Sequence, residues 1–147
     1  MKKLMTLMIF FAAANSVCAQ DWKTNLDEAL KEAAATRKNV LLVFSVPDAC
    51  DTCISLDRNV LKSEEFLSHV TPNFVLTRIE FKSSPGYTLS AEAKAKNLLI
   101  VERYNKDGFF PLVVALTPTE KVLGKIGSYN GESASEYNTM ISAFINN

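Results

Sequence analysis

Apolar residues recur along the chain with two different spacings, which separate predicted helices from predicted strands. Within 25–38, Leu26, Ala29 and Ala33 repeat at helical intervals. Within 40–44 the apolar run is continuous, as in a strand that is covered on both faces. The same tests along the whole chain predict helices over 25–38, 51–66, 89–104 and 133–145, and strands over 40–44, 74–81, 112–116 and 121–126.

Polar residues mark where two of the helices begin. Asn25, with Glu28 three residues later, has the form of a capping box. Trp22 lies just before it and is predicted to be a packing anchor for this first helix. Ser63, followed by two glutamates, looks like a fresh helix start, so the helix over 51–66 is expected to be long or broken.

The order helix, strand, helix, strand, helix, strand, strand, helix predicts an α/β fold. Two strands that are joined through a helix, 40–44 and 74–81, should be parallel with a right-handed crossover. The turn sequence Thr117-Pro118-Thr119-Glu120 is a hairpin signal between the last two strands, which should therefore be antiparallel. We expect a four-stranded mixed sheet with helices on both faces.

The first residues have the layout of a secretory signal peptide. Lys2 and Lys3 precede an apolar run over 4–14, and a small-residue triplet follows at 17–19. The apolar run is too short to span a hydrocarbon core, which needs roughly 20 residues. We therefore expect a signal peptide over 1–19 and a periplasmic or secreted protein.

Residues 20–147 are expected to form one domain, because they are enough to build a core of their own. They carry 14 basic and 16 acidic residues, a net charge that argues against nucleic acid as a partner. No later apolar run approaches membrane-spanning length, so no membrane anchor is expected after signal cleavage. A lipid anchor on Cys18 is less favoured, because the three residues before it match the usual lipoprotein sequence poorly.

Cys50 and Cys53 form a Cys-x-x-Cys motif directly after an apolar strand and at the start of a helix. In that context the spacing indicates a redox pair. Two intervening residues bring the sulfurs within bonding distance, while the first stays exposed at the helix end and the second faces inward. Cys50 would attack a substrate disulfide, and Cys53 would then resolve the mixed disulfide. This catalytic chemistry needs no cofactor and no metal.

Residues 39–66 resemble the secreted thioredoxin-like family through the stretch NVLLVFSVPDACDTCISLDRNVLKSEEF. Members of that family carry Phe-Thr/Ser-x-x-Asp-Trp-Cys-x-x-Cys followed by a Leu-acid-x-x-Val/Phe helix. The resemblance implies a thioredoxin-like fold, a four-stranded mixed sheet flanked by helices on both faces, and thiol–disulfide oxidoreductase activity. It also implies a cis-proline at Pro111, which would hold the Phe110 backbone ready to pair with an extended substrate segment and keep metals off the thiols.

Three positions depart from the pattern of that family. Ala49 stands where the family usually has Trp, so the aromatic wall beside the nucleophile is expected to be missing. The family's buried, proton-accepting Asp is replaced by Val43 when Phe44 is aligned with the family's Phe. Phe110 is larger than the residue often found before the cis-proline. We therefore expect the two-sulfur chemistry to be kept, and substrate contact and proton transfer to differ.

Charges near the motif predict a pair that leans toward reduction of its substrates. A helix N-terminus stabilises a thiolate by roughly 0.3 to 2 kcal/mol. Asp48 and Asp51 oppose it by roughly 0.6 to 2.4 kcal/mol each. No His or Lys lies between the cysteines. The expected partners are protein thiols or disulfides as substrates, and a redox partner protein that recycles the pair.

Three other interpretations of the motif stay open. The two cysteines could form a structural disulfide that never turns over. The two thiolates could also hold Cu(I) or contribute half of a zinc site. Further ligands are scarce, because His69 is distant in sequence and is predicted to be a surface or helix-end residue, and no Met follows the signal peptide until Met140. The third is a redox-inactive module that binds peptides in a groove around Phe109, Phe110 and Pro111.

Overall fold

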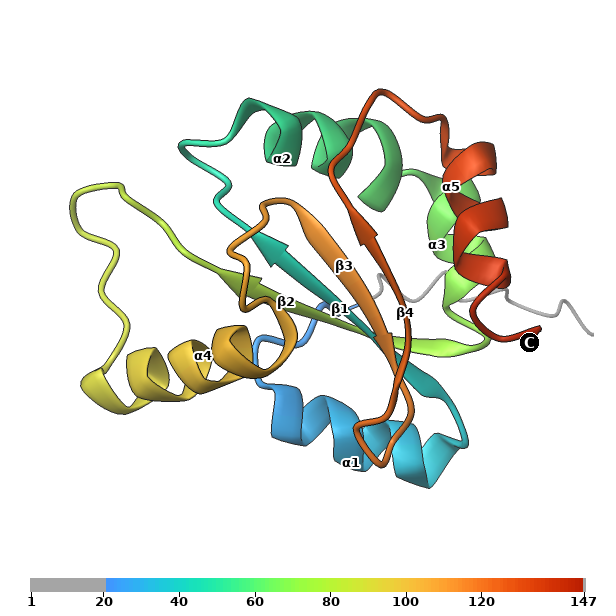
Figure 1. Cartoon of the computed structure of the whole chain (residues 1–147), viewed down its shortest axis with the longest axis horizontal. Coiled ribbons are helices and arrows are strands. Elements are labelled where there is room, and N and C mark those ends of the chain that lie inside the picture. The colour runs from blue at the N-terminus through green and yellow to red at the C-terminus, as the bar shows by residue number, and fades with distance from the viewer. Residues whose placement is uncertain (1–20, 147) are drawn as a thin grey trace, which may run out of the picture.

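A four-stranded sheet forms the centre of the molecule (Figure 1). The computed structural model describes residues 21–146, so the predicted signal peptide lies outside the described residues. β1 and β2 are parallel, whereas β1 with β3 and β3 with β4 are antiparallel, which confirms the predicted mixed sheet and hairpin. In the spatial order β2-β1-β3-β4, the strands are β2 Phe74–Glu80, β1 Asn39–Ser45, β3 Leu112–Leu116 and β4 Val122–Gly127.

Helices cover both faces of the sheet, as the sequence predicts (Figure 1). The first face carries α2 Asp51–Leu56, its π-helical continuation η1 Asp57–Leu61, α3 Glu64–Val70 and α5 Ala134–Ser142. The second face carries α1 Leu26–Thr36 and α4 Ala91–Tyr104. Among the residues that the structure describes, no helix is both long and apolar enough to cross a membrane.

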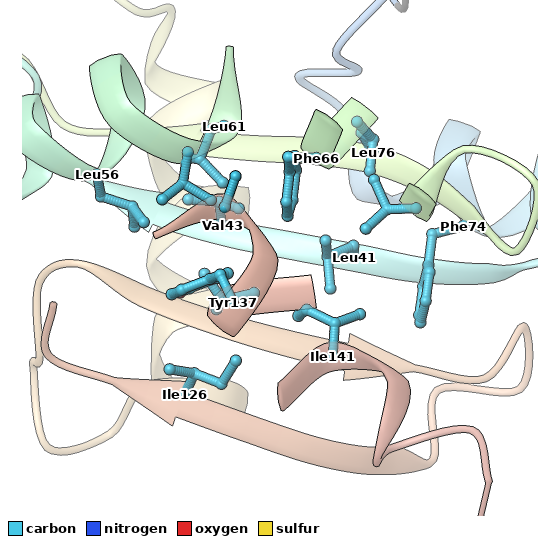
Figure 2. Packing of buried hydrophobic residues seen from close by; sticks show 14 of the residues in the cluster. Leu41, Val43, Leu56, Leu61, Phe66, Phe74, Leu76, Ile126, Tyr137 and Ile141 are labelled. Atoms are coloured by element: carbon cyan, nitrogen blue, oxygen red, sulfur yellow. The ribbon is translucent and has the colours of Figure 1, made fainter. Parts of the chain in front are cut away.

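β1 is an interior strand that is covered on both faces of the sheet. Leu41 and Val43 belong to the cluster under α2, α3 and α5, while Val40, Leu42 and Phe44 belong to the cluster against α1 and α4. This alternation follows from the two-residue repeat of a strand, and it explains why the predicted continuous apolar run is buried on both sides. Figure 2 shows part of the first cluster, in which Phe66, Tyr137 and Ile141 accompany the two β1 residues.

Short polar side chains begin the helices. Asn25 accepts hydrogen bonds from two N–H groups of the first turn of α1, and Ser63 accepts one from Phe66 at the start of α3. The helix predicted over 51–66 is therefore broken at Ser63. The reciprocal capping box lies elsewhere than predicted, because among the described helices Ser133 and Glu136 of α5 form it and Asn25 does not.

The residues just before α1 extend the sheet beyond β2. Lys23 pairs with Thr77 in a parallel bridge, and its N–H and carbonyl bond to the β2 backbone. The Trp22 ring lies 4.0 Å from the guanidinium carbon of Arg78 and packs against the cluster on the first face. The prediction for Trp22 is therefore wrong about its partner, because the ring packs on the opposite face from α1.

Candidate active site

Three loops meet at one end of the sheet (Figure 1). The parallel strands β1 and β2 both end there, in register at Ser45 and Glu80, and the antiparallel strand β3 begins there with Leu112 opposite Phe44. The loops that follow β1 and β2 and the loop that precedes β3 are therefore neighbours. We call this end of the sheet the redox end, because it carries both cysteines.

Cys50 is the N-cap residue of α2. Its backbone is extended, with φ at −131°, so it lies just outside the helix and presents Sγ to the free N–H groups of the first turn. The N–H of Cys53 donates to this sulfur over 3.2 Å, and the Thr52 hydroxyl lies 3.3 Å from it. The residue is partly exposed, so other molecules can reach its sulfur.

Cys53 lies inside the first turn of α2, with 2% of its surface exposed. Its sulfur forms a disulfide with Cys50, and the two Cα atoms are 5.2 Å apart. The two sulfurs differ in access, since one is at the surface and the other is behind it. An incoming thiol or thiolate therefore meets Cys50, which is the asymmetry that the sequence predicts for this pair.

The Phe110–Pro111 peptide bond is cis, as the family resemblance implies. Pro111 is buried at the start of β3, and the carbonyl oxygen of Phe110 lies 3.8 Å from Cys50 Sγ. The structure thus brings together all four residues that the sequence singles out, Cys50, Cys53, Phe110 and Pro111. They come from two segments about 60 residues apart in the chain.

A family model and a curated relative connect this chain with thioredoxin-like proteins. The model of the family described as Thioredoxin-like matches residues 21–118, about two thirds of the chain. The chain belongs to the thioredoxin-like family. It is 25% identical over 143 residues to the thioredoxin-related protein DsbJ of Chlamydia pneumoniae, covering 92% of this chain and 40% of that relative. The chain thus spans about two fifths of the relative's length.

Solved structures share the thioredoxin-like fold. A DsbH oxidoreductase superposes with a TM-score of 0.75 at 24% identity, covering 99% of this chain and 95% of that one. A disulphide isomerase from Xylella fastidiosa Temecula1 has a TM-score of 0.56 at 18% identity, covering 82% and 88%. The oxidised C-terminal domain of Neisseria meningitidis DsbD also has a TM-score of 0.56 at 18% identity, covering 83% and 97%.

The aromatic surroundings of the sulfurs differ from the usual pattern of the thioredoxin-like family. Ala49 is exposed and contributes no ring. Two phenylalanines, Phe81 just after β2 and Phe110 before the cis-proline, have ring centroids 5.9 Å apart in an edge-to-face contact and pack against the cluster on the second face. The bulky residue before the proline thus packs with a residue of a second loop.

Val43, which replaces the family's buried Asp, is fully buried in the first cluster. Asp57, at the start of η1, lies one turn after Cys53, and its N–H donates to the Cys53 carbonyl. Its oxygens lie 2.5 Å from Lys62 Nζ and from Arg78 Nη1. Burial raises the pKa of Asp57, whereas the two cations lower it by more. The pKa of Asp57 is therefore below its usual value. The group is an ion balanced by two cations at neutral pH.

Asp48 binds the loop that follows β2. Its Oδ2 accepts hydrogen bonds from the N–H of Ser83 at 2.8 Å, from the N–H of Ser84 at 2.6 Å and from the Ser84 hydroxyl. These bonds, with the Ser84 hydroxyl first, lower the pKa of Asp48. The carboxylate is therefore ionised at neutral pH, and its negative charge is one of the two that are expected from the sequence to oppose the Cys50 thiolate. The same carboxylate joins the loop that follows β1 to the loop that follows β2.

Asn105 is the site residue that sequence reasoning missed. The sequence marks it only as a turn residue after a helix, yet 2% of its surface is exposed. Its side-chain amide donates to the Phe109 carbonyl at 2.8 Å and accepts from the Phe109 N–H at 2.9 Å. Asn105 thus holds the backbone that leads into Phe110 and Pro111. No sequence pattern distinguishes this use of Asn from its ordinary use in turns.

A complete zinc site would need ligands besides the two cysteines. Within 21–146, no three His, Cys, Asp or Glu side chains gather in a way that could hold a metal ion. His69 lies at the end of α3, where it is exposed and its Nε2 is 2.8 Å from the Ser142 hydroxyl of α5. Its predicted place as a surface or helix-end residue is confirmed.

Proposed function

We propose that the protein is a thiol–disulfide oxidoreductase that exchanges disulfides with protein substrates through Cys50 and Cys53. The observation that carries the proposal is the unequal access of the two bonded sulfurs, with Cys50 partly exposed at a helix start and Cys53 buried behind it. Its membership of the thioredoxin-like family and its likeness to proteins named DsbJ and DsbH support the same activity.

The reaction transfers two electrons in two exchange steps. In the reduced protein, the Cys50 thiolate attacks a substrate disulfide, forms a mixed disulfide and releases one substrate thiolate. The Cys53 thiolate then attacks Cys50 Sγ, which releases the second substrate thiolate and leaves the Cys50–Cys53 disulfide. A redox partner protein carrying a dithiol reduces that disulfide and completes the cycle.

The groups around Cys50 have different roles in the two exchange steps. The Cys53 N–H, which donates to Cys50 Sγ in the disulfide, is placed to donate to the thiolate after reduction, and a hydrogen bond to an anion is stronger than one to a neutral sulfur. The Phe110 carbonyl, held by the cis-proline at Pro111, accepts an N–H from an extended substrate segment next to the reacting sulfur. Burial of Cys53 keeps it for the resolving step.

The proposed location is the periplasm or the exterior of the cell, with residues 1–19 as a signal peptide and 20–147 as the working domain. The charge and apolar pattern of the first residues supports export. A bond between Cys50 and Cys53 suits an oxidising compartment. The relatives named DsbJ, DsbH and DsbD are consistent with the same compartment.

The proposed poise leans toward reduction of substrates. Asp48 is held ionised and Asp51 is exposed in the first turn of α2, so two negative charges disfavour the Cys50 thiolate and with it the reduced state. The expected potential, measured by equilibration with glutathione buffers, is nearer to about −270 mV than to about −120 mV. A value at the oxidising end would contradict this poise without touching the exchange activity.

The test of the activity is insulin reduction with dithiothreitol as electron donor. The wild type should precipitate insulin faster than dithiothreitol alone, and Cys50→Ser should fall to that background because the attacking sulfur is gone. Cys53→Ser should instead accumulate a mixed disulfide with insulin. Background rates for the wild type, with a folded protein and an intact disulfide, would support the redox-inactive peptide-binding alternative.

A further inference from the structure

A cavity of about 280 Å³ lies between the loop that follows β2 and helix α4. We call it the α4 pocket. Its volume is just below the roughly 300 to 1,000 Å³ of small-molecule sites, so it has room for one or two side chains. Leu98 and Tyr87 are 61% and 38% exposed at its surface. The lining residues are Phe81, Lys82, Tyr87, Leu89, Lys94 and Leu98.

The α4 pocket is connected to the redox site through Phe81 and Phe110. Phe81 lines the pocket, and its ring contacts the Phe110 ring at 5.9 Å. The Phe110 carbonyl in turn lies 3.8 Å from Cys50 Sγ. The N–H of Phe81 donates to the Ser45 carbonyl at the end of β1, so its backbone is fixed to the strand that leads to the cysteines.

The wall of the α4 pocket is also tied to the Cys-x-x-Cys loop. Asp48, two residues before Cys50, accepts the N–H groups of Ser83 and Ser84. The Ser84 carbonyl accepts the N–H of Tyr87, which continues the connection to the pocket rim. A substrate that contacts the pocket therefore contacts a surface held in a fixed position relative to Cys50.

Two lysines give the α4 pocket a positive rim. Lys82 Nζ lies 3.4 Å from a Glu80 oxygen and 4.8 Å from the centre of the Tyr87 ring. Lys94 follows the start of α4 on the same helix face as Leu98, four residues later. Among the ion pairs of residues 21–146, none includes Lys94. The rim thus has one cation left to pair with a carboxylate.

We propose that the α4 pocket is a second recognition site for protein substrates, which takes a large apolar side chain and an acidic side chain two residues further along, on the same face of the extended chain. The proposal rests on the function proposed above. An extended chain advances about 3.3 Å per residue, so the residue that reaches past the two phenylalanine rings is about three to four positions from the substrate cysteine. The apolar side chain packs on Phe81 and Leu98, and the carboxylate pairs with Lys94.

The test uses short peptides whose single cysteine is a mixed disulfide with thionitrobenzoate. Cys50 attacks the peptide sulfur and releases thionitrobenzoate, which is measured by its absorbance, and Cys53 then releases the peptide thiol. One peptide carries Phe and Glu three and five residues from the cysteine, so that both side chains lie on the same face of the extended chain, and a second carries Ser and Gln there. The wild type should react about tenfold faster with the first, and equal rates would overturn the proposal.

Matched variants on the two faces of α4 locate the effect. The double variant Leu98→Ser with Lys94→Glu should lose the tenfold preference. Leu99→Ser with Lys96→Glu should keep it, because Leu99 is similarly exposed, at 65%, but lines a different cavity. Loss of the preference in both variants, or in neither, would overturn the proposal. So would a dimer of this chain that Leu98→Ser dissociates in analytical ultracentrifugation, since the pocket would then be occupied by a second copy.

Two reference reactions separate this proposal from the proposed function. Insulin reduction and the reaction with the symmetric thionitrobenzoate disulfide report on the sulfurs without requiring the α4 pocket. If both proceed normally while the peptides show no preference, the recognition site is wrong and the oxidoreductase activity stands. If insulin is not reduced at all, the proposed function itself fails.

Discussion

The two ends of the central sheet are held together in different ways. At the end opposite the redox end, short connections close onto the strands through backbone bonds, such as Asn39 N–H to the Asn73 carbonyl and Thr117 N–H to the Lys121 carbonyl. At the redox end the loops are longer and are joined by polar side chains. Asp48 joins two loops there, and Asn105 holds the backbone before the cis-proline.

This difference shows how an exposed site can still be well positioned. Backbone pairing at the opposite end continues the ladder of the sheet and leaves little of it open to a partner. At the redox end, side chains satisfy the loop N–H and carbonyl groups. The redox end therefore keeps exposed surface for a substrate, including Phe109, which is 55% exposed although Asn105 bonds its backbone. We therefore expect single substitutions at the redox end to reduce the rate of disulfide exchange more than equally destabilising substitutions elsewhere.

The largest expected effect of this kind is at Asn105. Asn105→Ala leaves the part-buried N–H and carbonyl of Phe109 without their side-chain partner, which costs about 1 kcal/mol of stability. Because the same segment presents Phe110 to the substrate, insulin reduction should also fall about tenfold or more. Stability is measured by urea denaturation, and turnover is measured at urea concentrations where the variant is fully folded.

Asn138 provides the matched control for Asn105. It is also buried, at 7% exposure, and its side-chain amide donates to the Glu65 carbonyl, which joins α5 to α3 away from the cysteines. Asn138→Ala should cost a comparable amount of stability and leave insulin reduction unchanged. Similar losses of turnover in the two variants would break the distinction between the two regions.

A smaller effect is expected at Asp48, and it depends on pH. The pKa of Asp48 is lowered in the folded protein, so its contribution to stability is present at neutral pH and is lost as the pH falls below its unfolded value of about 3.9. Asp48→Asn should lower the urea midpoint at pH 7, and the difference from the wild type should shrink toward pH 2.5. Loss of this charge favours the Cys50 thiolate, but it also weakens the connection between the two loops, and we expect the second effect to be larger. Insulin reduction at pH 7 should therefore fall severalfold, less than in Asn105→Ala.

Asp51 is the control for the charge at position 48. It is exposed on the other side of Cys50, and the structure shows no hydrogen bond or ion pair for its carboxylate among the described residues. Asp51→Asn should leave the urea midpoint nearly unchanged at both pH values. An equal response of the two variants would mean that Asp48 acts through its charge alone and not by joining the loops.

Much of the fold follows from local patterns that tertiary contacts reinforce. The continuous apolar run at 40–44 predicts a strand buried on both faces, and it becomes the central β1. The hairpin signal at 117–120 likewise lies between two antiparallel strands. The predicted partner of Trp22 is wrong for a long-range reason, since Lys23 pairs with β2 and turns the ring toward Arg78 instead of α1.

The amino-acid sequence alone determined which two atoms carry the chemistry proposed for this protein. Two cysteines separated by two residues, after an apolar strand and before a helix, must place their sulfurs close together with unequal access. Only the tertiary structure decided what surrounds them. The Phe81–Phe110 contact and the bonds of Asp48 are made between neighbouring loops whose meeting depends on the strand order of the sheet. The two bonds of Asn105 close one of those loops on itself. Local patterns report the conformation of a segment, whereas a surface for substrate depends on which segments become neighbours.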